Sequence, residues 1–214
     1  MPSHLPLRPL TVGFDLDMTL IDSRPGIKAA YQALSAETDT YIDTDLAVTR
    51  LGPPLELELA QWFPEELIPA MVERYREIYP TYAIEPTTAM AGAAEAVAAV
   101  QRLGGRAIVV TAKHEPNAKL HLAHLGIEPD AVIGWLWAEA KAEALSEHNA
   151  SVYVGDHIGD VRGARTAGAL SVAVPTGPIG ADELRAAGAE VVLADLTEFP
   201  GWLESYVAEA DARP

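Results

Sequence analysis

Short runs of apolar residues recur along the chain, each bounded by glycine, proline or charged residues. Side chains alternate between the two faces of a sheet, so a strand with one face in water cannot be apolar at every position. Continuous apolar runs are instead typical of strands buried on both faces, as in parallel sheets. The pattern therefore predicts buried parallel strands at residues 10–14, 107–110, 131–133, 152–154, 170–174 and 191–193.

Segments with helical periodicity separate these runs, and we expect helices at residues 93–103, 116–125, 138–148 and 161–167. Gly104, Gly126 and Gly168 stand where a helix commonly ends in a left-handed residue. Strands that alternate with helices in this way indicate an α/β fold with a doubly wound, mainly parallel sheet.

The interval between the first and second predicted strands is too long for one crossover helix. Residues 24–87 contain no convincing strand, and Ser23 followed by Pro25 suits the start of a helix. Further proline residues divide the segment, which we expect to hold about four helices of usual length. Pro69 falls within one helical pattern, so that helix either kinks there or begins later than Pro64. The prediction is a small α-helical cap (lid) domain at residues 24–87, inserted after the first strand of a core formed by residues 1–23 and 88–214.

Composition narrows the class of protein. The 214 residues are 49% hydrophobic, enough for one substantial core and a small second one, and they carry a formal net charge of -16. Such a charge argues against a nucleic-acid partner, because little would neutralise the phosphate backbone. There is no cysteine, no signal-like N-terminus and no apolar stretch near the ~20 residues of a membrane helix. We expect a cytoplasmic protein that binds no membrane; the oligomeric state stays open.

The first candidate for chemistry is the segment Asp15-Leu16-Asp17-Met18-Thr19, directly after the first predicted strand. Two carboxylates two residues apart can lie on the same side of an extended chain. One can act as a nucleophile and the other as an acid. An acidic loop or a helix cap is the structural alternative, and the position after a buried strand favours chemistry, because ligands bind at the carboxyl ends of strands in such sheets.

Three further features also follow predicted strands or lie in a predicted helix. The Thr111 hydroxyl follows a strand and could donate to a phosphate oxygen, although threonine is common at strand ends. The Lys141 ammonium could neutralise a phosphate, although a solvated lysine on a helix is commoner. In Gly155-Asp156-His157-Ile158-Gly159-Asp160, the two carboxylates could bind Mg²⁺, or the first could cap a helix. No G-x-G-x-x-G motif follows the first strand, so a dinucleotide cofactor is disfavoured.

These features together resemble the haloacid dehalogenase superfamily, in particular its phosphoglycolate-phosphatase-like hydrolases with an inserted helical cap. The matching motifs are GFDLDMTLIDS, VVTAK, Lys141 and VGDHIGD, in that order. The resemblance implies Asp15 as the nucleophile, Asp17 as general acid and base, Thr111 and Lys141 as the phosphate-holding residues, Asp156 as a magnesium ligand and Asp160 as its support. Two positions depart from the pattern: Met18 replaces a frequent Gly or Phe, and Ala142 a frequent Pro. Lys113 is the alternative to Lys141.

The predicted reaction also follows from charge. A phosphate monoester dianion repels an attacking carboxylate, so a site with Asp15, Asp17, Asp156 and Asp160 needs a divalent cation. Mg²⁺ is expected, because all the offered ligands are oxygens. We therefore predict a magnesium-dependent phosphatase that forms an aspartyl phosphate. A sugar phosphomutase of the same superfamily and a non-enzymatic, receiver-like phospho-acceptor are the alternatives, and the second would lack the insertion at 24–87.

The substrate is expected to be a small phosphorylated metabolite. Residues 24–87 hold 11 acidic and 5 basic side chains, which disfavours a highly charged ligand. Residues 50–55 join two predicted helices and resemble the cap loop that faces the substrate in relatives. Arg50 is therefore the candidate for substrate specificity, as a partner for a carboxylate or second anionic group; an ordinary interhelical turn with a solvated arginine is the alternative.

Overall fold

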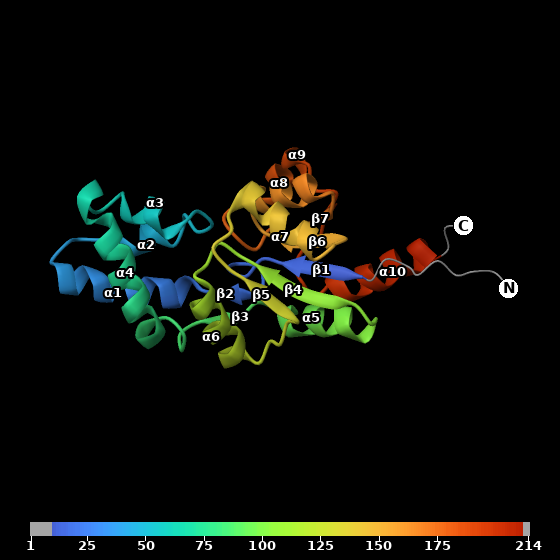
Figure 1. Ribbon diagram of the computed structural model, residues 1–214, viewed down its shortest axis with the longest axis horizontal. Coiled ribbons are helices and arrows are strands. Elements are labelled where there is room, and N and C mark those ends of the chain that lie inside the picture. The colour runs from blue at the N-terminus through green and yellow to red at the C-terminus, as the bar shows by residue number, and fades with distance from the viewer. Residues whose placement is uncertain (1–9, 212–214) are drawn as a thin grey trace.

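The computed structural model describes residues 10–211 and contains a parallel six-stranded sheet (Figure 1). The strand order is β5-β4-β1-β6-β7-β8, and every neighbouring pair is parallel. The strands are β1 (Thr11–Phe14), β4 (Arg106–Val110), β5 (Ala131–Ile133), β6 (Val152–Gly155), β7 (Leu170–Ala173) and β8 (Val191–Val192). Each lies within a residue or so of a predicted strand, which confirms the α/β fold class.

Both faces of the sheet are buried, as continuous apolar strands require. Val12 and Phe14 pack in one hydrophobic cluster, while Tyr153 and Ile108 belong to a second cluster on the opposite face. Gly13 points to the second face, where an added Cβ would lie 2.8 Å from both Leu145 and Tyr153. The sheet is therefore the middle layer of three, with helices above and below.

The helices of the core divide between these two faces. On the first face lie α5 (Ala93–Arg102), α6 (Glu115–Leu125) and α10 (Phe199–Asp211), and on the second lie α7 (Lys141–Glu147), α8 (Ile158–Ala167) and α9 (Ala181–Ala187) (Figure 1). The predicted helix 138–148 is a 3-10 turn, η2 (Ala138–Ala140), followed by α7. Neither α9 nor α10 is among the predicted helices.

Residues 24–87, called the helical insertion below, contain α1 (Arg24–Thr38), α2 (Thr44–Ala47), α3 (Leu55–Leu59), the 3-10 turn η1 (Glu65–Leu67) and α4 (Ile68–Tyr82). Pro69 lies in the first turn of α4, so the helix begins after Pro64 instead of kinking. These helices bury their own cluster, which includes Leu34, Leu59 and Val72 and is separate from the clusters of the sheet. Such a division of buried residues is what a cap domain at 24–87 would produce.

A short two-stranded ribbon joins the helical insertion to the core. Its strands are β2 (Ile21–Asp22) and β3 (Thr88–Ala89), which pair antiparallel, Asp22 opposite Thr88. The sequence pattern does not predict them, because two residues are too few for a period to be visible. The ribbon brings the entry and exit of the insertion together, close to the carboxyl end of β1.

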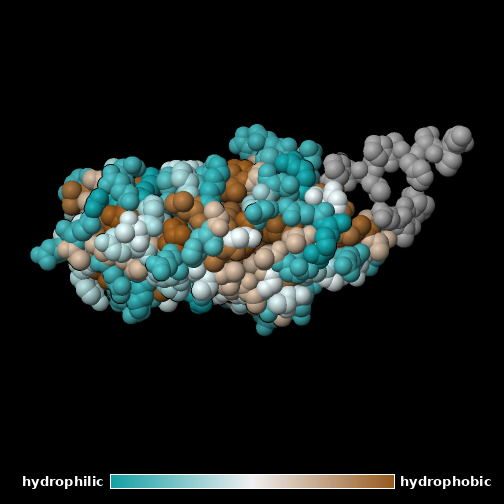
Figure 2. All heavy atoms as spheres, turned by 90° about the horizontal axis from the view of Figure 1, so that it is seen from below, coloured by the Kyte–Doolittle hydropathy of each residue, from teal (hydrophilic) through white to brown (hydrophobic). Residues whose placement is uncertain are grey.

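Figure 2 shows hydrophilic residues over much of one side of the molecule, with hydrophobic residues between them mainly along its middle. Within residues 10–211, no helix has the length and apolar character needed to cross a membrane.

Candidate active site

The candidate active site lies where three neighbouring strands end. Asp15 follows β1, Thr111 follows β4 and Asp156 begins the loop after β6. Since β4 and β6 flank β1, their carboxyl ends meet at one edge of the sheet. The backbone N–H of Asp15 still donates to the Val154 carbonyl, at 2.8 Å, so β6 holds the predicted nucleophile in place.

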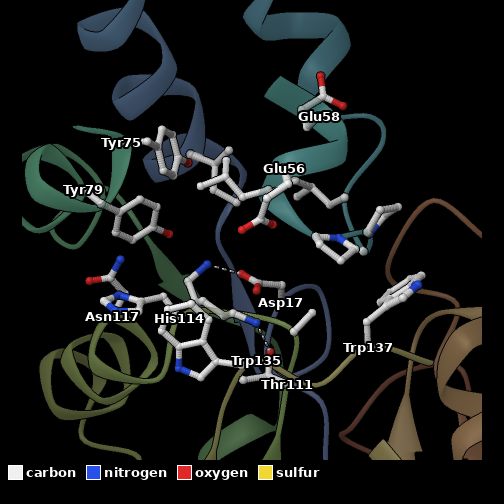
Figure 3. Close-up of a pocket in the computed structure, with 18 of the residues that line it drawn as sticks. Asp17, Glu56, Glu58, Tyr75, Tyr79, Thr111, His114, Asn117, Trp135 and Trp137 are labelled. Carbon is white, nitrogen blue, oxygen red and sulfur yellow. Dashed lines mark hydrogen bonds and ion pairs between the residues drawn. The ribbon is translucent and has the colours of Figure 1, made fainter. Parts of the chain in front are cut away.

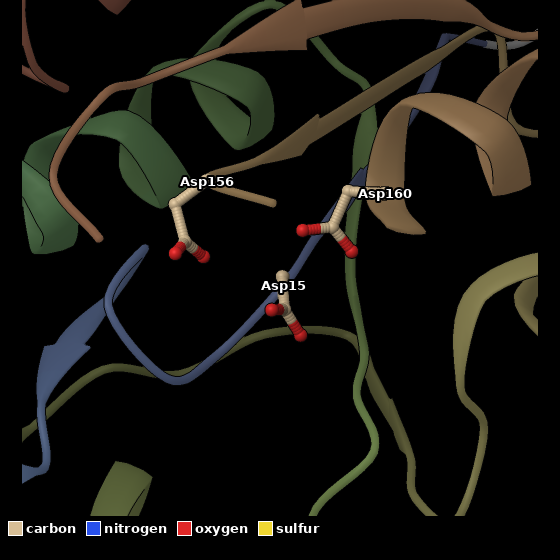
Figure 4. A group of neighbouring side chains, drawn as sticks. All are labelled: Asp15, Asp156 and Asp160. Atoms are coloured by element: carbon tan, nitrogen blue, oxygen red, sulfur yellow. The ribbon is translucent and has the colours of Figure 1, made fainter. Parts of the chain in front are cut away.

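Three carboxylates gather at this edge. Asp15, Asp156 and Asp160 are all buried, and each offers an oxygen within 4.8 Å of the others (Figure 4). The Thr19 hydroxyl donates to Asp156 at 3.0 Å. The structure thus brings together three of the four predicted metal-binding residues.

Lys141 is the cation of this cluster. Its ammonium donates to Asp15 at 2.9 Å, to Asp160 at 2.6 Å and to the Tyr153 hydroxyl at 2.9 Å, and the side chain is 1% exposed. Tyr153 in turn donates to the Val110 carbonyl at 2.7 Å. Of the two lysines considered from the sequence, Lys141 is therefore the one beside the predicted nucleophile.

Among the described residues, the three buried carboxylates of the cluster have only one neighbouring cation, Lys141, to balance their negative charge. Burial raises the pKa of Asp15 to about 7, although Lys141 opposes the shift and Asp160 adds to it. The pKa of Asp156 is raised well above its ordinary value by burial and by the charges of Asp160 and Asp15. A divalent cation among these oxygens would relieve the repulsion, so the residues present fit a metal ion. Asp15, Asp156 and Asp160 are the residues that would hold it.

Two glycines leave room for the carboxylates. An added Cβ at Gly155 would lie 2.4 Å from the Asp160 carboxylate, and one at Gly177 would lie 1.7 Å from an Asp156 oxygen. Asp160 also accepts from the backbone N–H of His157 at 3.1 Å, within the capping box that begins α8. The N-cap is therefore His157 and not Asp156, so both aspartates point into the cluster.

Asp17 lies apart from the three clustered carboxylates. Its side chain forms an ion pair with Lys113 at 2.8 Å, and Lys113 lies over the Tyr79 ring with its ammonium 5.0 Å from the ring centroid. Met18, which follows, has a left-handed φ of 61°, a conformation that glycine adopts more easily. The metal role predicted for Asp17 is therefore not supported by the position of its carboxylate.

The charge state of Asp17 follows from this pair. Burial alone would raise the pKa of Asp17, but the charge and hydrogen bond of Lys113 outweigh burial and lower it. The carboxylate is thus ionised in this state of the protein. Thr111 is buried beside the pair, and its hydroxyl accepts from the Lys113 backbone N–H at 3.2 Å.

Sequence reasoning missed several supporting residues. Thr19 belongs to the motif GFDLDMTLIDS, so a role for its hydroxyl near the carboxylates could have been predicted from the sequence. Tyr153 gives no such signal, because a tyrosine inside an apolar strand is typical of ordinary core packing. Gly177 contacts Asp156 only through the fold, and its sequence position after β7 indicates no more than a turn.

A cavity of about 270 Å³ lies between the helical insertion and the core (Figure 3). Asp15, Asp17, Thr111 and Lys113 line its core side, whereas every residue of 50–55 lines the opposite side. Gly52, with φ of 127°, lies so close to the core that an added Cβ would be 3.2 Å from Trp137 and from His157. Arg50 lines the cavity, and its guanidinium is paired with Glu58 at 2.6 Å.

Comparison with known proteins identifies the family. A family model described as haloacid dehalogenase-like hydrolase matches residues 12–174, a span that includes the helical insertion and the clustered carboxylates. The chain belongs to this family. The resemblance seen in the sequence motifs is thereby confirmed.

The hydrolase has relatives of more than one described activity. It is 26% identical to a phosphoglycolate phosphatase of Caulobacter vibrioides, over 89% of each chain. It is 31% identical to the tyrosine-protein kinase PtkA of Mycobacterium tuberculosis, over 79% of this chain and 63% of PtkA. Its fold superposes on a predicted phosphatase from Clostridium acetobutylicum with a TM-score of 0.78 and 25% identity, covering 92% of this chain and 99% of that one.

Proposed function

We propose that this hydrolase is a Mg²⁺-dependent phosphatase that transfers the phosphoryl group of a small phosphate monoester to Asp15 and then to water. One observation carries the proposal. The Asp15 carboxylate lines the cavity while it also belongs to the buried cluster with Asp156, Asp160 and Lys141. A carboxylate that is both open to a ligand and surrounded by groups that control charge is suited to nucleophilic attack.

The bound cation would supply charge neutralisation, so that a phosphate dianion can approach the aspartates. The offered ligands are all carboxylate oxygens, which favours Mg²⁺ over softer metals. Asp15 attacks phosphorus with one oxygen. Lys141 holds the nucleophile in position and, with the Thr111 hydroxyl, stabilises the oxygens of the phosphoryl group.

Asp17 would move the proton. It donates to the leaving alkoxide and later accepts a proton from the water that attacks the aspartyl phosphate. The first step needs a protonated Asp17, whereas Lys113 now holds it ionised. If a phosphate oxygen of the substrate binds the Lys113 ammonium in place of Asp17, the pKa of Asp17 rises. Substrate binding itself would then favour the protonated form of Asp17 that the first step needs.

The helical insertion would act as the lid. Its loop at 50–55 closes one side of the cavity and so limits access of water during phosphoryl transfer. The same insertion argues against a receiver-like module, which would not carry it.

The test is release of inorganic phosphate from a panel of small monoesters, with Asp15→Asn as the blank. Activity should vanish in chelator and return with Mg²⁺, but return little with Ca²⁺, whose larger shell can take both Asp15 oxygens. Turnover in chelator would refute the metal role.

Trapping of the phosphoenzyme tests the nucleophile. Labelled phosphate should be trapped on the wild-type chain and not on Asp15→Asn, and label on Asp15→Asn would refute the assignment of Asp15. Transfer to a second hydroxyl without phosphate release would indicate a phosphomutase.

A further inference from the structure

The cations that line the cavity are already engaged by carboxylates. Lys113 pairs with Asp17 at 2.8 Å, Arg50 with Glu58 at 2.6 Å and Arg76 with Glu56 at 3.1 Å. These are the only lysine and arginine side chains in the described lining. A second anionic group on a substrate would therefore compete with these carboxylates for the cations.

The two arginines are also held by aromatic rings. The Arg76 guanidinium lies 4.4 Å from the centroid of Trp135, and that of Arg50 lies 5.7 Å from Trp62. The Nε atoms of both arginines lack a hydrogen-bond partner, but both atoms are buried and so do not face the open cavity. These two Nε groups therefore do not make an anion receptor on the cavity wall.

In the described part of the chain, the wall opposite Asp17 offers an unpaired carboxylate oxygen, on Glu56, together with aromatic rings. Figure 3 shows the Glu56 carboxylate pointing into the cavity toward Asp17, with Tyr75 and Tyr79 on one side and Trp137 on the other. One Glu56 oxygen accepts from Arg76, and the other accepts no hydrogen bond within residues 10–211. Aromatic faces next to carboxylates are the surroundings that stabilise an organic cation.

We propose that this wall is a subsite for a positively charged leaving group, so that the preferred substrates are phosphate monoesters of amino alcohols, with Glu56 as counter-ion. The inference rests on the proposed phosphatase function and names its substrate class. The net charge of -16 acts in the same direction, since it attracts a cationic group and repels a second anion. Likeness to phosphoglycolate phosphatases thus does not extend to the carboxylate of their named substrate.

Three esters of nearly equal size test the inference: the monophosphates of ethanolamine, ethylene glycol and glycolate, whose leaving groups are cationic, neutral and anionic near neutral pH. We expect kcat/KM to fall in that order, with the value for the ethanolamine ester about tenfold or more above that for the glycolate ester. A ratio of this size corresponds to the free energy of a modest cation–π contact together with a screened charge pair. Glu56→Gln should reduce this ratio by about tenfold. Glu66→Gln removes the same charge from an exposed position of the insertion outside the cavity, and should keep the wild-type ratio.

Two results would overturn the inference: a glycolate ester hydrolysed as well as the ethanolamine ester, or a Glu56→Gln ratio equal to that of Glu66→Gln. An aryl phosphate separates this failure from failure of the proposed function. If Asp15-dependent hydrolysis of the aryl phosphate persists while the ratio is wrong, only the substrate class is refuted. If neither the aryl phosphate nor any of the three esters is hydrolysed, the phosphatase proposal fails and the inference with it.

Discussion

At the scale of single residues, the pair between Asp17 and Lys113 combines a structural and a chemical role. Asp17→Asn removes the proton carrier, so turnover should fall by at least ~10²-fold. It also leaves the Lys113 ammonium, whose side chain is 8% exposed, without its carboxylate, which should cost about 3 kcal/mol of unfolding free energy. Denaturant unfolding and steady-state kinetics measure the two effects separately.

The double variant Asp17→Asn/Lys113→Met separates these roles. Removing both partners of a buried pair leaves no unpaired charge, so stability should return toward wild type while activity stays low. Near-normal rates in either variant would show that Asp17 is only a structural partner of Lys113.

The raised pKa of Asp15 leads us to predict that metal binding depends on pH. Burial raises the pKa of Asp15 to about 7 in the metal-free protein, so below pH 7 the ion must displace a proton from this carboxyl. Displacement of the Asp15 proton should therefore make Mg²⁺ affinity rise with pH by up to about tenfold per pH unit below pH ~7, and the raised pKa of Asp156 adds to this dependence. Calorimetry in two buffers of different ionisation enthalpy counts the protons released. Asp15→Asn should release one proton fewer per ion, and an unchanged proton count would contradict the assignment.

At the scale of elements, α1 and α4 pack closely because Gly26 has no side chain. A Cβ at this position would lie 2.1 Å from the backbone oxygen of Ala83, which cannot move without displacing the end of α4. Gly26→Ala should therefore lower the unfolding free energy by about 1–3 kcal/mol. It should also lower kcat/KM, since α4 supplies Tyr75 and Tyr79 to the cavity.

Gly201→Ala is the matched control for Gly26→Ala. Gly201 lies in α10 with nothing within 4 Å of an added Cβ, so alanine there should leave stability unchanged or raise it by up to about 1 kcal/mol. Thermal unfolding of both variants measures the difference, and equal unfolding midpoints would show that the close contact of α1 with α4 contributes little to stability.

At the scale of the whole molecule, the ribbon of β2 and β3 allows the helical insertion to be removed. Asp22 pairs with Thr88, so an Asn-Gly turn between them can close a hairpin in place of residues 23–87. The sheet and its hydrophobic clusters do not depend on the cluster of the insertion, and we expect the shortened chain to fold cooperatively. It should hydrolyse an aryl phosphate slowly and lose discrimination among the matched esters. A chain that fails to unfold cooperatively would contradict the predicted domain division.

The sequence by itself determined the sheet, most of its helices and the position of the predicted nucleophile. Strands buried on both faces require continuous apolar residues, and this requirement is local, so β1, β4 and β6 were visible as runs. Residues that follow neighbouring parallel strands meet at one edge, which is why Asp15 and Asp156 could be placed together. The length of the segment 24–87 and its helical periodicity likewise predicted the insertion.

Only the tertiary structure decided which polar side chains meet. Lys141 reaches Asp15, 126 positions earlier in the chain, because α7 packs against β4 and Tyr153 supports its ammonium. Asp17 turns to Lys113, and Arg50 to Glu58, through contacts that no local pattern reports. The physical reason is that periodicity follows from backbone geometry over a few residues, whereas the charge state and orientation of a buried side chain depend on partners brought close by the whole fold.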